Sequence, residues 1–189
     1  MKKVVLLGDS IRLIGYGTKV AELLGEGYEV WQPEENCRYS TYTMRLLFEY
    51  QKEIKGADVI HWNNGLWDAV DCLFGDGAFT NIDIYVENMK RMAKILLGYG
   101  KKVIFATTTP TGAKYNDISV LDKHNNERIK EYNDAVVPVL KEMGVIINDL
   151  HSVVDGHTDE YLLDDNLHLN EKGIDVCAKK VVSMIKDAI

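Results

Sequence analysis

Short apolar runs alternate along the chain with longer amphipathic stretches. The first run, Val4 to Leu7, ends at Gly8-Asp9 and is typical of a strand buried on both faces. Further apolar runs of strand length predict strands over 28–32, 58–62, 103–107 and 145–150. Apolar positions with helical spacing predict helices over 16–24, 41–54, 82–97, 125–143 and 171–189.

Strand-like runs separated by helices are the pattern of a parallel sheet with helices on both faces. We expect an α/β fold, a three-layer sandwich with a five-stranded parallel sheet, formed by one domain over residues 1–189. Ligands of such sheets bind at the carboxyl ends of the strands. The segments expected at that edge are 8–10, 36–41, 63–68, 107–110 and the residues before the last helix.

A serine stands where the first strand is expected to end, in the sequence Gly8-Asp9-Ser10-Ile11. Glycine permits a tight turn, which would present the Ser10 hydroxyl above the edge of the sheet. The backbone N–H groups of a following helical turn would point at the same place and can stabilise an oxyanion. The alternative is a simple turn with Ser10 as a helix N-cap. Arg12 is either a substrate contact or a solvated residue at the start of a helix.

An acidic residue and a histidine stand three positions apart near the C-terminus, in Asp165-Asn166-Leu167-His168. In a turn, the Asp165 carboxylate can accept a hydrogen bond from Nδ1–H of His168 and fix the tautomer of the ring. The other ring nitrogen is then free to take a proton from a nucleophile. Asp164 is a neighbouring carboxylate, but the spacing favours Asp165. The alternative is a polar turn in which the aspartate caps the last helix.

Together, the Ser10 turn and the Asp165-x-x-His168 pair resemble the first and last sequence blocks of the SGNH (GDSL-like) hydrolase family. The resemblance covers essentially the whole chain. It implies a flavodoxin-like SGNH fold, with Ser10 as nucleophile, His168 as its base and Asp165 as the acid that orients the base. It also implies a serine esterase that requires no cofactor and no metal ion. The spacing of His157, Asp164, Asp165 and His168 itself fits no standard zinc motif.

The two middle blocks depart from the family pattern. In the segment 36–41, Thr41 takes the place of the family's glycine, which contributes a backbone N–H to the oxyanion hole. In the segment 65–68, Trp67 takes the place of the family's asparagine, which contributes a side-chain amide. The resemblance therefore implies an oxyanion hole formed by the N–H groups of Ser10 and Thr41 and by a replacement for that amide.

Three side chains are candidates for the replacement donor. We favour the amide of Asn64, then that of Asn63, and both over the indole N–H of Trp67. The alternative for Trp67, as for Trp62, is packing in the core. Loss of one such donor typically costs about 2.7–4 kcal/mol of transition-state stabilisation, so we expect one of these groups to fill the role.

The leading hypothesis is two-step acyl transfer on a small-molecule ester. Asn, Asp and Trp residues over 63–68 suit a polar ligand, and tryptophan faces stack on sugar rings, which favours a carbohydrate O-acetyl ester or another small acyl ester. Arg12 and Trp67 are the candidate substrate contacts. A thioesterase or acyltransferase on the same site is one alternative. A non-catalytic, flavodoxin-like binding module is another, because a fold alone does not determine function.

Composition narrows the choice of partners. The net charge of −7 argues against a basic surface for nucleic acid. The sequence has no apolar run near the roughly 18 residues that span a bilayer, so we expect no membrane partner. The three cysteines are scattered without a C-x-x-C pair, as expected for reduced thiols in the cytoplasm. The oligomeric state has no signal in the sequence.

Overall fold

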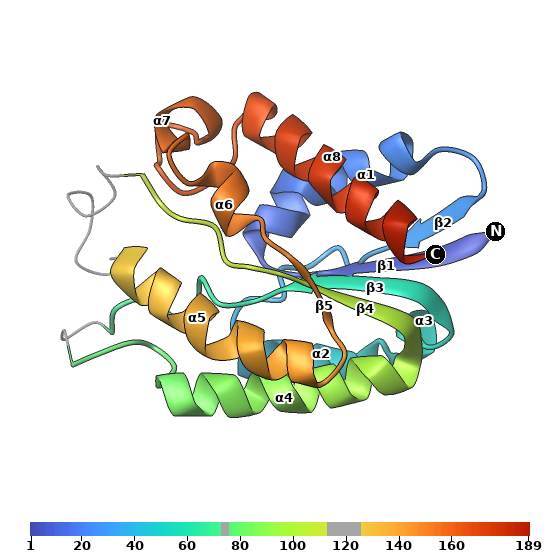
Figure 1. The fold of residues 1–189 in the computed structure, drawn as a ribbon, viewed down its shortest axis with the longest axis horizontal. Coiled ribbons are helices and arrows are strands. Elements are labelled where there is room, and N and C mark those ends of the chain that lie inside the picture. Colours follow the sequence, from blue (N-terminus) through green and yellow to red (C-terminus); the bar gives the residue numbers. More distant parts are fainter. Residues whose placement is uncertain (73–75, 113–125) are drawn as a thin grey trace.

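The strands form one parallel sheet in the computed structural model, which describes residues 1–72, 76–112 and 126–189 (Figure 1). The strand order is β2-β1-β3-β4-β5, the order of flavodoxin-like sheets, and its direction reverses between β1 and β3. The predicted α/β class with a five-stranded parallel sheet is confirmed. The strands are β1 (Lys2–Leu7), β2 (Tyr28–Trp31), β3 (Ala57–Asn63), β4 (Gly100–Ala106) and β5 (Ile146–Asn148).

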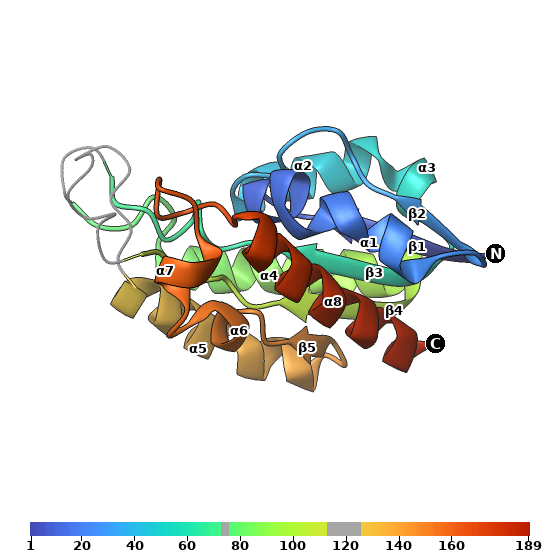
Figure 2. The ribbon, with the colours of Figure 1, turned by 90° about the horizontal axis from the view of Figure 1, so that it is seen from above.

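Helices cover both faces of the sheet, as Figures 1 and 2 show. One face carries the π-helical turn η1 (Ile11–Tyr16), α1 (Gly17–Leu24), α6 (His151–Val154), α7 (Thr158–Tyr161) and α8 (Glu171–Ala188). The other carries α2 (Ser40–Glu49), α3 (Gln51–Ile54), α4 (Ile82–Tyr99) and α5 (Asn126–Glu142). The helix α1 packs against α8 and α4 packs against α5, which completes the predicted three layers.

The elements begin and end close to the predicted positions, with explicable differences. The helix predicted over 41–54 divides into α2 and α3 at Tyr50, and the helix predicted to end at 97 continues through Gly98 to Tyr99. The start predicted at 125 lies outside the described residues. Gly25 ends α1 with φ +75°, a left-handed conformation that glycine adopts without strain. The short segments η1, α6 and α7 were not predicted, because a few residues give no clear periodicity.

The register of the sheet determines what meets at its carboxyl edge. Leu7 pairs with Trp62, so the residues after β1 and after β3 are neighbours. The apolar core lies between the sheet and its helices, and includes Trp62 packed against Phe105 with ring centroids 5.0 Å apart. Figure 1 shows α7 and the start of α8 at this carboxyl end, opposite the N-terminus. In the described parts of the chain, no helix is both long and apolar enough to cross a membrane.

Candidate active site

The turn that carries Ser10 follows β1 directly. At Gly8 a Cβ atom would lie 2.0 Å from Asn63 Oδ1, so only glycine fits against β3 here. Asp9 then closes the turn: its Oδ1 accepts from the N–H of Ile11 at 2.9 Å. The Asp9 carbonyl accepts from the N–H of Arg12 and of Leu13, the next residue, at 3.1 and 2.9 Å. The N–H groups of Ile11, Arg12 and Leu13 therefore already have acceptors and are not free for an oxyanion, contrary to the expectation from the sequence. The N–H of Ser10 lies before these three groups and makes none of these hydrogen bonds.

A continuous chain of hydrogen bonds joins Ser10 to the segment before α8. His168 Nε2 lies 3.0 Å from Ser10 Oγ, and His168 Nδ1 lies 2.7 Å from Asp165 Oδ2. The other carboxylate oxygen, Asp165 Oδ1, accepts from the backbone N–H groups of Leu167 and His168, both at 2.9 Å. The structure thus brings together Ser10, Asp165 and His168, which are separated by up to 158 positions in the sequence.

The electrostatics of Asp165 suit an orienting carboxylate. Partial burial raises the pKa of its carboxyl, but the hydrogen bonds from His168 and from the two backbone N–H groups outweigh burial and leave the pKa below its ordinary value. The carboxylate is therefore ionised at neutral pH and accepts the proton on Nδ1 of His168. That tautomer leaves the lone pair of Nε2 directed at the Ser10 hydroxyl.

The loop that carries Asp165 and His168 is closed at its base. Leu162 and Leu169 form an antiparallel bridge, and the N–H of Leu163 donates to the carbonyl of His168 at 2.8 Å. Because the loop returns on itself, the carboxylate and the imidazole are fixed relative to each other by backbone contacts as well as by their own hydrogen bond.

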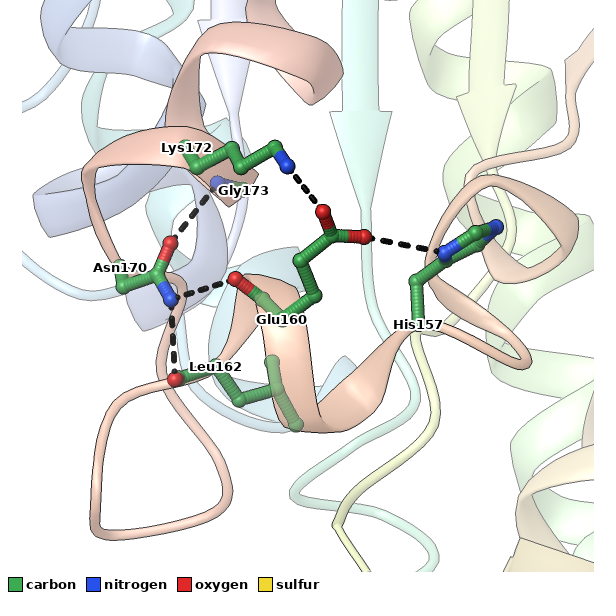
Figure 3. Close-up of polar contacts among 6 residues, drawn as sticks. All are labelled: His157, Glu160, Leu162, Asn170, Lys172 and Gly173. Carbon is green, nitrogen blue, oxygen red and sulfur yellow. Dashed lines mark hydrogen bonds and ion pairs between the residues drawn. The ribbon is translucent and has the colours of Figure 1, made fainter.

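Asn170 fastens the base of this loop to the helices on either side (Figure 3). Its Oδ1 accepts from the N–H of Gly173 at 3.0 Å and caps α8, while its Nδ2 donates to the carbonyls of Glu160 at 2.8 Å and Leu162 at 3.1 Å. The Glu160 carboxylate also pairs with Lys172 and His157. A helix-cap signal in the sequence identifies Asn170 as the residue before α8, but gives no sign of its two further contacts.

Comparisons with known proteins agree with this architecture. No family model matches the chain. A curated GDSL esterase/lipase of Oryza sativa subsp. japonica is 25% identical over 177 residues, a match that spans 89% of this chain and 66% of the rice protein. A GDSL esterase/lipase of Arabidopsis thaliana is 24% identical over 98% of this chain and 79% of its own length. The similarity to these relatives supports the SGNH (GDSL-like) hydrolase family. It also supports an ester-hydrolysing enzyme.

Solved structures share the fold of this chain. A lipase/acylhydrolase from Enterococcus faecalis superposes with a TM-score of 0.79 at 23% identity, over 99% of this chain and 96% of that one. Axe2, an acetylxylan esterase from Geobacillus stearothermophilus, superposes with a TM-score of 0.75 at 15% identity, over 97% and 94% of the two chains. At such identities the likeness establishes the fold alone.

The preference for Asn64 as an oxyanion donor in this hydrolase is wrong. Asn64 Nδ2 donates to the carbonyl of Arg38 and to Thr43 Oγ1, both at 2.9 Å, so both of its amide protons are used. The Asn64 side chain thus joins the end of β3 to Arg38, before α2, and to Thr43, within α2. Arg38 has φ +50°, and the hydrogen bond to its carbonyl helps to hold this unfavourable backbone conformation.

Asn63 lies on the other side of β3, against the turn that carries Ser10. Its Nδ2 donates to Asp9 Oδ1 at 2.8 Å, which leaves one amide proton, and its Oδ1 accepts from the Tyr16 hydroxyl at 2.7 Å. The side chain is 5% exposed. Because successive residues of a strand point to opposite faces, only one of the two neighbouring asparagines can reach the Ser10 side. That residue is Asn63.

Thr41 lies in the first turn of α2, where helix geometry supplies no acceptor for the backbone N–H. Its helical backbone needs no positive φ, so threonine can stand where the family has glycine. The neighbouring Ser40 is fixed by Asp68, whose carboxylate accepts from Ser40 N–H at 2.9 Å and from Ser40 Oγ at 2.6 Å. Burial raises the pKa of Asp68 to about 6. The sequence pattern placed Asp68 only among the polar residues that suit a ligand, yet Asp68 ties the loop after β3 to the start of α2.

The prediction that Arg12 contacts substrate is wrong. Its side chain is fully buried and its guanidinium donates to the carbonyls of Gly8 at 3.0 Å, Pro33 at 2.8 Å and Glu35 at 2.7 Å. Arg12 therefore holds the segment after β2 against the Ser10 turn. The acceptor carbonyls after β2 lie up to 23 residues away in the sequence, so local pattern gives no indication of them.

The two tryptophans differ. Trp62 is fully buried in the core, whereas Trp67 is 40% exposed, so the core-packing alternative holds for Trp62 and is wrong for Trp67. Trp67 stands on the loop after β3, directly before Asp68, and its role towards substrate stays a prediction. Across residues 1–72, 76–112 and 126–189, no three His, Cys, Asp or Glu side chains gather as a metal site requires.

Proposed function

We propose that this SGNH hydrolase is a serine esterase in which Ser10 is the nucleophile, His168 the general base and Asp165 the residue that orients His168. The observation that carries the proposal is the 3.0 Å contact between Ser10 Oγ and His168 Nε2, with Nδ1 of the same ring 2.7 Å from Asp165. Both distances lie within reach for proton transfer along a Ser-His-Asp chain.

The proposed reaction has two steps. Ser10 Oγ attacks the ester carbonyl carbon while His168 Nε2 takes the hydroxyl proton. The tetrahedral intermediate collapses to an acyl-serine, and His168 returns the proton to the leaving alcohol. Water, activated by the same nitrogen, then attacks the acyl-serine, releases the acid and restores Ser10. Ionised Asp165 stabilises the imidazolium in both steps.

We assign the oxyanion to three donors that the geometry leaves available. These are the backbone N–H groups of Ser10 and Thr41, each at the start of a helical segment, and the remaining amide proton of Asn63. Asn63 replaces Asn64 in this role because both amide protons of Asn64 are donated elsewhere. Each such donor contributes about 2.7–4 kcal/mol in enzymes of this kind.

For the substrate we propose a carbohydrate O-acetyl ester or another small acyl ester. The exposed indole of Trp67 at the carboxyl edge of the sheet suits stacking on a sugar ring. The structural neighbour Axe2 is an acetylxylan esterase. A thioesterase or acyltransferase would use the same nucleophile and differ in the leaving group or the acceptor.

An ester panel tests this proposal. Sugar acetates, a p-nitrophenyl acyl series and an acyl thioester are assayed with the wild type, Ser10→Ala and the matched control Ser183→Ala, a serine exposed on α8. We expect wild type and Ser183→Ala to hydrolyse short acyl esters equally and Ser10→Ala to lose the activity. Activity retained in Ser10→Ala would overturn the assignment, and inactivity of the wild type on the whole panel would favour a binding module.

A further inference from the structure

Three buried side chains beside the Ser10 turn form a hydrogen-bonded series that the proposed reaction does not use directly. The Tyr16 hydroxyl donates to Asn63 Oδ1 at 2.7 Å, and Asn63 Nδ2 donates to Asp9 Oδ1 at 2.8 Å. Tyr16 is 0%, Asp9 1% and Asn63 5% exposed. Hydrogen bonds between buried polar groups of this kind restrict a site to one arrangement.

The series closes a ring around the turn. Asp9 stands immediately before Ser10, and its Oδ1 also accepts from the N–H of Ile11 at 2.9 Å. Tyr16 is the last residue of η1, the π-helical turn that begins at Ile11. From Asp9 the backbone passes through Ser10 and η1 to Tyr16, and the side chains return through Asn63 to Asp9. A shift of any member therefore moves the segment that carries the nucleophile.

The ring also fixes which way the Asn63 amide faces. A carboxylate accepts only, so the Asn63 atom bonded to Asp9 is the nitrogen, and the oxygen faces the Tyr16 hydroxyl. Burial raises the pKa of Asp9, and the hydrogen bonds from Asn63 and Ile11 oppose that rise. The Tyr16 ring lies edge-on to His61, with centroids 5.5 Å apart, which holds its hydroxyl in place.

We propose that Tyr16 is a positioning residue for catalysis: its hydroxyl locks the amide of Asn63, and through Asn63 it holds the Ser10 turn and the remaining Asn63 proton in their reactive arrangement. The proposal rests on the proposed function, because it presumes that Ser10 reacts. Misplacement of reacting groups by about 1 Å can cost about 100-fold in rate, so loss of one remote hydroxyl has a measurable effect.

The first test is Tyr16→Phe, which removes the hydroxyl and keeps the ring. We expect kcat for p-nitrophenyl acetate to fall about tenfold with KM within about twofold of wild type, because substrate contacts are unchanged. The rate at which a fluorophosphonate labels the protein should fall by a similar factor. Tyr132→Phe is the matched control, a buried tyrosine whose hydroxyl donates to the carbonyl of Thr80 at 2.5 Å. It should lose comparable thermal stability and keep wild-type kcat.

The second test asks whether Tyr16 acts through Asn63. In the Asn63→Ala background, Tyr16→Phe should lower kcat no further, since the amide that it locks is gone. Equal fold-losses in both backgrounds would overturn the proposal, as would a Tyr16→Phe protein with lower stability and wild-type kcat. If Tyr16→Phe fails to fold, a folded Asn63→Ala protein with wild-type kcat overturns the proposal by itself.

The Ser10→Ala variant distinguishes failure of the Tyr16 positioning role from failure of the proposed esterase activity. If Ser10→Ala is inactive and Tyr16→Phe keeps wild-type kcat, the positioning role fails and the serine esterase stands. If Ser10→Ala keeps activity, the serine esterase fails, and the positioning role fails with it.

Discussion

Ser10 lies on a turn whose partners come from distant, buried parts of the chain. Asp165 and His168 lie on a loop whose contacts, apart from that of His168 with Ser10, are mostly local and exposed. The Ser10 turn is held by Arg12, which is 0% exposed, and by Asn63, which is 5% exposed. The side chain of Asp165 is 46% exposed and that of His168 25%. The first region is part of the core, and the second is a surface loop fastened at its base.

This difference separates stability from activity. Substitutions at the Ser10 turn leave buried carbonyls and charges without partners, so they should weaken the whole fold. Substitutions in the Asp165–His168 loop remove exposed contacts of small net value, so they should reduce activity and leave the fold nearly unchanged. Substitutions in each of the two regions test this contrast.

His168→Ala should reduce kcat/KM for a short acyl ester by at least about 1000-fold, because the serine loses its base. The free energy of unfolding should change by less than about 1 kcal/mol, since a partly exposed ring is removed. His157→Ala is the matched control, because His157 also pairs with a carboxylate three residues away, that of Glu160 at 3.2 Å. Comparable activity losses in both variants, measured by initial rates, would contradict the role of His168.

Arg12→Met should lower the free energy of unfolding by about 3 kcal/mol or more, because the carbonyls of Gly8, Pro33 and Glu35 lose a charged donor inside the protein. Urea denaturation measures the loss. Arg45→Met, at an exposed arginine paired with Glu49, should cost less than about 1 kcal/mol. Similar losses in the two variants would show that Arg12 does not hold the turn.

Asp68 should make stability depend on pH with a sign opposite to that of Asp165. Its pKa of about 6 in the folded protein lies above the ordinary 3.8, so the native state binds more protons between these values. Its contribution is fully present below pH 4 and is lost as the pH rises through 6, by about 3 kcal/mol. Urea denaturation at several pH values should show this decline in wild type and a flatter profile in Asp68→Asn; parallel profiles would refute the assignment.

Asn170→Ala should lower kcat several-fold, because the base of the acid–base loop loses its ties to Glu160 and Leu162. Asn81→Ala is the control, since Asn81 caps α4, which like α8 has 18 residues. Both variants should lose about 1 kcal/mol of stability on removal of a cap. A kcat change of equal size in Asn81→Ala would mean that cap loss alone explains the effect.

The sequence predicted the parts of the fold and the site that rest on local pattern. Buried strands such as Val4 to Leu7 are continuous apolar runs, and the parallel sheet follows from their alternation with helices. Ser10 and the Asp165-x-x-His168 pair stand in short motifs at predicted element ends. Their proximity was expected because ligands gather at the carboxyl edge of such sheets.

The sequence could not predict which neighbouring residue faces which partner. Asn63 and Asn64 are adjacent, and their side chains point in opposite directions. A shift of the end of β3 by a single residue would exchange those directions. Arg12 resembles a solvated residue at a helix start, yet its acceptors are carbonyls on the segment after β2. Tyr16 gave no signal, because its partner Asn63 lies 47 positions away and only the fold brings them together.

The proposed reaction requires that Ser10 is activated by an imidazole that Asp165 orients. Mass spectrometry of the protein after treatment with a fluorophosphonate tests it most directly, because the reagent marks the activated serine. We expect one label per chain, on the peptide that contains Ser10, and a labelling rate at least about 100-fold lower in His168→Ala. A stoichiometric label on another residue, or an unchanged rate in His168→Ala, would contradict it.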